Sequence, residues 1–202
     1  MKTRHTVLGL SAVALLLTGC ASSDGSGTAA AGGAGMSMAP GESMAPGQSM
    51  AAMSMAPVVS EPSKAAKMVC TGDVRDEVKN VLKLSSPAPI STTWRDQLYT
   101  CTYTLPMGKM VLSVKESAGK PAAVAYFQAL RTRLGGTQPA PGLGEQAYAT
   151  KTGTVVVLKD NTTLRVDTTG LPAVFGPQQQ RRTDLAYEIA SVVLGCWVEH
   201  VS

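Results

Sequence analysis

Six methionines lie within twenty residues near the N-terminal end of the chain, and their sulfur atoms could bind a soft metal ion. They are Met36, Met38, Met44, Met50, Met53 and Met55. Thioether sulfur favours Cu(I) among the biological metals. The same methionines fall in a repeat of Ser-Met-Ala-Pro-Gly with no His or Cys nearby, so a low-complexity linker is the competing interpretation. Copper(I) binding is therefore the alternative functional expectation for this chain.

Three cysteines follow Cys20, namely Cys70, Cys101 and Cys196, and they allow at most one disulfide among themselves. Cys70 precedes a predicted helix, and Cys101 lies on one face of a predicted strand. A helix laid on that sheet can bring the two Cα atoms within the roughly 4.4–6.8 Å that a disulfide needs. We therefore expect a Cys70–Cys101 disulfide and a buried Cys196, with a Cys70–Cys196 disulfide as the alternative.

The other groups that could perform chemistry are few and poorly placed. His200 is the third residue from the end of the chain, and with Cys196 it supplies only two of the four ligands of a structural zinc site. Asp73 and Glu77 share one face of a predicted helix, where such carboxylates usually face solvent near the helix N-terminus. We therefore expect no enzyme and no cofactor.

The segment Gly142-Leu143-Gly144-Glu145-Gln146-Ala147 has the spacing of a dinucleotide-binding loop. That chemistry requires a strand before the glycines and a helix after them. Here a Pro-Ala-Pro segment precedes the glycines and a predicted strand follows them, so we reject this interpretation.

The first nineteen residues have the parts of a secretory signal peptide. Lys2 and Arg4 make the start basic, and residues 7–17 form an apolar run shorter than the about 20 residues of a membrane span. The run ends in Leu17-Thr18-Gly19-Cys20, which resembles a bacterial lipobox, where the cysteine thiol carries a diacylglycerol. We therefore expect lipidation of Cys20 and anchoring at the outer face of the cytoplasmic membrane, because two acyl chains hold a protein firmly.

Composition divides the mature chain into a tether and one domain. Residues 20–67 consist almost wholly of Gly, Ala, Ser, Met and Pro, without an aromatic residue, and are predicted to be a disordered tether. Residues 68–202 have the length of one ordinary domain. Without Lys2 and Arg4 the chain has 16 basic and 14 acidic side chains, a net charge of +2. A nucleic-acid partner is excluded, since it would need a basic stripe.

Hydrophobic periodicity predicts an α+β domain. Helical stripes cover residues 71–83, residues 121–134 and residues 177–197. Alternating or apolar runs predict strands at residues 98–104, 110–114, 146–150, 154–159 and 162–167. The order of these elements predicts an antiparallel sheet of about five strands with three helices packed on one face.

Three features together resemble small secreted lipoproteins of actinobacteria that carry a domain of unknown function. They are the lipobox with its long tether, the placement of Cys70 and Cys101, and residues 142–148 followed by "GTVVVLKDNTTLRVD". The likeness covers roughly residues 68–198. The likeness implies an α+β sandwich broadly similar to the fold of the extrinsic oxygen-evolving subunit of the photosystem. It also implies that the domain functions in extracytoplasmic binding or sensing. It supplies no catalytic residues.

The expected anchor and tether, and the lack of residues arranged for catalysis, favour a binding or sensing domain of the cell envelope. Its partners would be the membrane, through the N-terminal lipid, and an envelope protein or small-molecule ligand.

We predict that Cys20→Ala leaves the precursor uncleaved or releases the protein from the membrane fraction, because the thiol is the attachment point of the lipid. Fractionation and intact-mass measurement check this, with Cys196→Ala as the matched control. A Cys20→Ala protein that is fully processed and still membrane-bound would contradict the lipobox.

Overall fold

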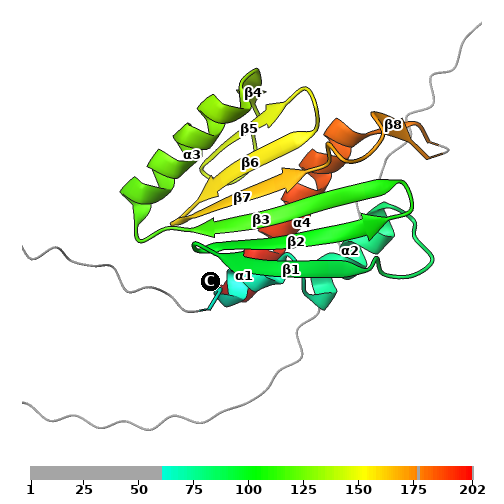
Figure 1. Cartoon of the computed structure of the whole chain (residues 1–202), viewed down its shortest axis with the longest axis horizontal. Helices are drawn as coiled ribbons and strands as arrows, with labels where there is room; N and C mark the ends of the chain where they lie inside the picture. The colour runs from blue at the N-terminus through cyan, green and yellow to red at the C-terminus, as the bar shows by residue number, and fades with distance from the viewer. Residues whose placement is uncertain (1–60, 177, 202) are drawn as a thin grey trace, which may run out of the picture. The chain divides into compact units, whose positions relative to one another are not determined.

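A computed structural model describes residues 61–176 and 178–201, with side chains as far as Trp197. The signal peptide, Cys20, most of the predicted tether and its six methionines lie outside these described residues. The described chain is α+β, as the sequence predicts. Its main sheet is antiparallel, with the strand order β1-β2-β3-β7-β6-β5-β4 (Figure 1).

Groups of helices and strands alternate along the described chain. The helices are α1 (Lys64–Met68), α2 (Gly72–Val81), α3 (Lys120–Leu134) and α4 (Arg182–Val201). The strands of the main sheet are β1 (Ile90–Arg95), β2 (Leu98–Leu105), β3 (Gly108–Glu116), β4 (Thr137–Pro139), β5 (Gln146–Thr150), β6 (Thr154–Lys159) and β7 (Thr162–Asp167). A separate two-stranded sheet pairs β8 (Val174–Phe175) with β9 (Gln180–Arg181).

The main sheet has seven strands rather than the predicted five. The five predicted strands are present as β2, β3, β5, β6 and β7, and the two additional strands, β1 and β4, lie at the edges. The predicted helices correspond to α2, α3 and α4, but α4 begins at Arg182 and not at Pro177, because β9 occupies the intervening residues. The sequence predicts neither α1 nor the small sheet.

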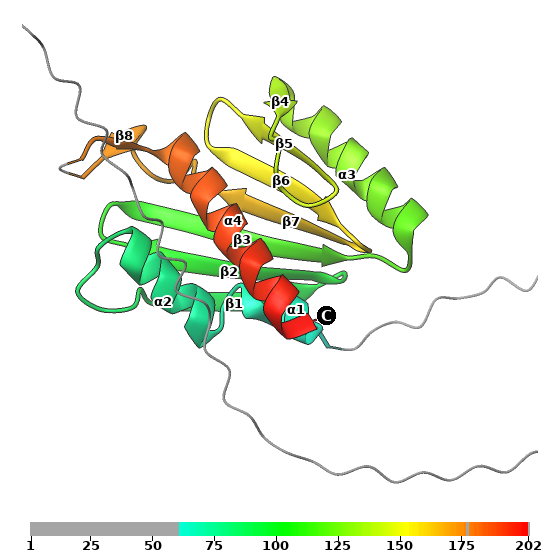
Figure 2. The same ribbon diagram turned by 180° about the vertical axis from the view of Figure 1, so that it is seen from behind.

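The helices cover both faces of the sheet, which corrects the prediction that they share one face. Strand β6 is buried on both sides, so its side chains distinguish the faces. Val156 and Leu158 join the core cluster of α3, which includes Phe127. Val155 and Val157 point to the opposite face, along which α4 crosses (Figure 2).

The junction between α1 and α2 is attached to β2 by one covalent bond and one hydrogen bond. The predicted Cys70–Cys101 disulfide is present, with 5.7 Å between the Cα atoms. The Tyr103 hydroxyl donates a hydrogen bond of 2.6 Å to the carbonyl of Val69. Cys196 lies outside this disulfide and is buried on α4.

Helix α1 begins at Lys64, inside the segment that composition assigns to the tether. The Ser63 hydroxyl caps it by accepting a hydrogen bond of 3.1 Å from the N–H of Ala66. The Trp197 indole donates a hydrogen bond of 2.9 Å to the carbonyl of Ala65. The packed domain therefore begins before residue 68, because α4 provides partners that a composition rich in Ala and Lys does not reveal.

Every helix in residues 61–176 and 178–201 is too short or too polar to cross a bilayer.

We predict that Tyr103→Phe lowers the free energy of unfolding by about 1–3 kcal/mol, because it leaves the Val69 carbonyl buried without its donor. Burial raises the pKa of the Tyr103 phenol above its ordinary value, and Arg75 lowers it only in part. A phenol whose pKa is raised by folding stabilises the protein fully below about pH 10, and this stability is lost as the pH rises further. Tyr103→Phe should therefore also weaken the loss of stability above pH 10.

Denaturant titration with the disulfide intact measures both effects. Tyr99→Phe is the control, since the Tyr99 hydroxyl makes no hydrogen bond within the described residues. Equal stabilities for the two variants would contradict a structural role for the Tyr103 hydroxyl.

Candidate functional site

The residues whose types could perform chemistry lie on two helices that pack together. Asp73 and Glu77 lie on α2, and Cys196 is buried on α4, which contacts α2. The side chain of His200 is not described. Over residues 61–176 and 178–201 no group of three or more His, Cys, Asp or Glu is arranged to hold a metal ion.

The glycines that have dinucleotide-loop spacing perform a packing role. Gly144 has φ +53, and a Cβ atom there would lie 2.7 Å from the carbonyl oxygen of Leu158. The N–H of Glu145 donates a hydrogen bond of 2.9 Å to the same carbonyl. No helix follows the glycines, because the chain continues into β5. Gly144 therefore allows two backbone segments to approach closely.

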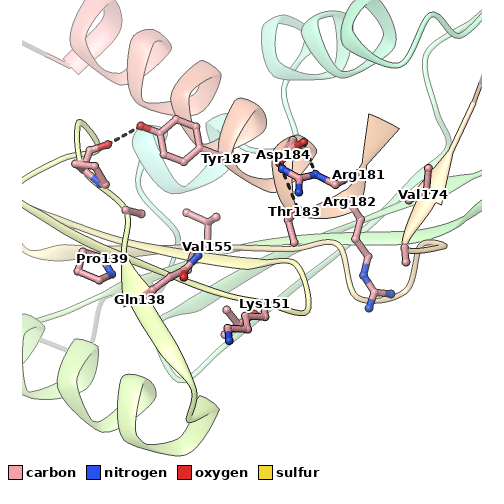
Figure 3. A pocket seen from close by; sticks show the side chains of 15 residues that line it. Gln138, Pro139, Lys151, Val155, Val174, Arg181, Arg182, Thr183, Asp184 and Tyr187 are labelled. Carbon is pink, nitrogen blue, oxygen red and sulfur yellow. Dashed lines mark hydrogen bonds and ion pairs between the residues drawn. The ribbon is translucent and has the colours of Figure 1, made fainter. Parts of the chain in front are cut away.

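A hollow of about 650 Å³ lies between the β4–β5 edge of the sheet and the first turns of α4 (Figure 3). The loop before β5 and the turn between β5 and β6 form one side. Strand β8 and the start of α4 form the other. Its lining comprises residues 138–141, 149–151, 155, 173–174, 181–184 and 187.

The hollow exposes apolar surface that other parts of the described chain bury. Val174 is 42% exposed and Tyr187 is 39% exposed, and no other large apolar side chain of the described residues is as exposed as these two. Both line the hollow, where Pro139 and Ala149 add further apolar surface. Large exposed apolar groups gathered in a concave site are typical of a binding surface.

The charges at the hollow are mainly positive. The Arg181 guanidinium donates hydrogen bonds of 2.9 Å to both carboxylate oxygens of Asp184, and these bonds hold the pKa of that carboxyl below its usual range. Lys151 projects from the β5–β6 turn and makes no ion pair within the described residues. Arg182 also has no carboxylate partner in the described residues, because its guanidinium donates to the carbonyls of Thr169 and Leu171. The uncompensated charge at the hollow therefore suits an anionic group.

Hydrogen bonds hold the two sides of the hollow in place. The Tyr187 hydroxyl donates a hydrogen bond of 2.5 Å to the carbonyl of Pro141, which attaches the loop before β5 to α4 (Figure 3). The fully buried Thr168 hydroxyl lies 2.7 Å from the carbonyl of Gly153 and 2.8 Å from that of Arg182. It therefore connects the β5–β6 turn, which carries Lys151, to the start of α4.

The sequence did not predict this site. Its residues come from four separate segments of the chain. The sequence predicts a loop at residues 138–141 and the start of a helix at residues 181–187, and it predicts no helix or strand at residues 173–174. The Pro-Ala-Pro segment before β5 and the turn at Lys151 predict changes of direction, but they do not predict that the chain returns to them from residues 173–187. Tyr187, an aromatic residue outside the apolar stripe of the last predicted helix, is the one local signal.

Comparisons with known proteins give no match to this chain among profiles of protein families, curated proteins or solved structures.

We predict that Thr168→Val lowers the free energy of unfolding by about 0.5–1.5 kcal/mol, because it removes the single O–H that the carbonyls of Gly153 and Arg182 share, while the Gly153 carbonyl keeps the N–H of residue 168. The matched control is Thr163→Val in β7. Thr163 is also buried, but its hydroxyl has no hydrogen-bond partner among the described residues, so its replacement should leave stability unchanged or raise it. Denaturant unfolding of both variants measures the difference. A Thr168→Val protein as stable as Thr163→Val would show that this hydroxyl does not hold the hollow together.

Proposed function

We propose that this chain is a lipid-anchored extracytoplasmic binding domain of a bacterial cell envelope. The anchoring half of the proposal is supported by the sequence, in which residues 1–19 have the parts of a signal peptide and Cys20 follows them in a segment that resembles a lipobox. A lipid on Cys20 would place the domain at the outer face of the cytoplasmic membrane.

The binding half is supported by the hollow beside α4. The single observation that carries it is the position of Val174 and Tyr187, because the two most exposed large apolar side chains of the described residues line the same concave surface. A solvent-exposed surface of this kind favours an occupant that covers it.

The chemistry of the lining favours an amphipathic ligand with an anionic group. An apolar part would contact Val174 and Tyr187, and an anionic group would face Lys151 and Arg182. The carboxylate of Asp184 would repel an anionic ligand only weakly, because the guanidinium of Arg181 is paired with it. The lining contains no His or Cys among its described residues, and nucleophilic catalysis generally needs a nucleophile beside a base. Binding is therefore the activity that we propose.

Octanoate is a suitable probe, because it joins an apolar chain to one carboxylate. We predict saturable shifts of the backbone amide signals of Ala149, Lys151 and Val174 when the full chain is titrated with octanoate in NMR spectra. Octyl glucoside, which has the same apolar chain and an uncharged head, should bind more weakly.

Lys151→Gln should weaken octanoate binding roughly 1.4-fold to fivefold at low salt, since a solvent-exposed charge pair contributes about 0.2–1 kcal/mol, and salt should reduce the difference. Lys79→Gln on α2, outside the hollow, is the matched control and should bind like the unchanged protein. Non-saturable shifts, or equal effects of the two lysine variants, would contradict the proposed ligand site.

A further inference from the structure

The two edges of the main sheet differ in whether they can accept another strand. Strand β4 has three residues and ends in Pro139, and short strands and prolines are the features by which sheets protect an edge. Strand β1 has six residues, contains no proline and carries only one charge, that of Arg95. It forms the other edge of the sheet, at the bottom of the view in Figure 1. The β1 edge therefore lacks the protection of the β4 edge.

The hydrogen-bond pattern identifies the backbone groups that β1 leaves open. In an antiparallel pair, alternate residues direct both backbone groups toward the neighbouring strand. The carbonyl of Pro89 accepts a hydrogen bond of 2.9 Å from the N–H of Thr104, so residues 91, 93 and 95 also face β2. The N–H and C=O groups of Ile90, Thr92 and Trp94 therefore face away from the sheet. No backbone hydrogen bond from outside the sheet reaches these three residues within the described chain.

The geometry points to a second copy of this chain as the partner of β1, joined to it as an antiparallel strand pair about a twofold axis at Thr92. In this register Thr92 faces Thr92 of the second copy, and Ile90 faces Trp94. Every outward backbone group of the three residues then has a partner. Shifting the axis to Thr93 leaves the groups of Ile90 unpaired, and so the spacing of the open groups selects one register.

The side chains suit the same register. Residues that oppose one another across an antiparallel pair lie on the same face. Ile90 and Trp94, both half-buried, would form a mixed apolar pair on the helix-covered face. Ser91 would face Thr93 on the other face. The two Arg95 side chains would lie at opposite ends of the paired strands, so no like charges meet.

The symmetry also agrees with attachment to one membrane, a point that rests on the proposed anchor. A twofold axis perpendicular to the sheet leaves the same face of both copies on the same side. Helix α1, with which the described chain begins, packs against α4 on the face that α4 crosses. Both copies would therefore continue toward their N-terminal ends from one side of the joined sheet.

Light scattering coupled to size-exclusion chromatography tests this inference on the full chain in detergent, over a range of protein concentrations. We expect a mass that rises from one copy toward two. Thr92→Pro should remain a single copy throughout, because it removes the N–H at the axis. Proline is tolerated on an edge strand where its nitrogen faces outward, so the pairing with β2 should persist. Thr92→Val keeps the N–H and the branched shape, and it should associate like the unchanged protein.

Thermal unfolding of both variants shows whether Thr92→Pro still folds. If it does not, Thr92→Lys decides the question, since two lysines at the axis should oppose association most strongly at low salt. A single copy at every concentration overturns the inference, as does association that Thr92→Pro and Thr92→Lys leave unchanged. Capture of a different protein through the β1 edge by a chain that stays a single copy also overturns it. None of these outcomes depends on whether octanoate binds at the hollow.

Discussion

The burial of α4 along one face of the sheet is the constraint on which most of the fold depends. Leu185, Ile189 and Val193 are fully buried on this helix, which spans twenty residues. One end of α4 provides Tyr187 at the hollow and Asp184, which pairs with Arg181 of β9. The other end receives α1 through the indole of Trp197. A single apolar stripe thus fixes the positions of two regions that are distant in the sequence.

The sequence predicts those helices and strands whose apolar residues recur with a clear helical or strand spacing. Strand β6 reads as a continuous apolar run because both of its faces are covered, and α2 shows a plain helical stripe. Strand β1 escapes prediction because Ser-Thr-Thr interrupts the apolar alternation between Ile90 and Trp94. At three residues, β4 is too short for any pattern. Edge strands are half exposed, and they therefore lack the contrast between buried and exposed positions on which pattern arguments rest.

Which face of the sheet a helix covers could not be read from periodicity either. The apolar stripe of α3 predicts that this helix packs against the sheet. The face that it covers depends on the connection from β3 and on the side chains that β5 and β6 direct to that face. The hollow is less predictable still. Its lining depends on the return of residues 173–187 to a turn and a loop that precede them by more than twenty residues. The disulfide could be predicted because covalent geometry limits the choices, and three cysteines leave few pairings.

The position of the Cys70–Cys101 disulfide determines how the domain would respond to tension applied through its N-terminal end. A pull transmitted along the chain to Lys64, as the proposed anchor would apply it, would reach α1 first and then Cys70, where the disulfide would transfer the force directly to β2. Residues 71–100, which include α2 and β1, form a covalently closed loop beside this path. Tension would therefore separate α1 from α4 while β1, at the edge of the sheet, remains in place. Reduction of the disulfide would expose residues 71–100 to the tension, and α2 would become the next segment to extend.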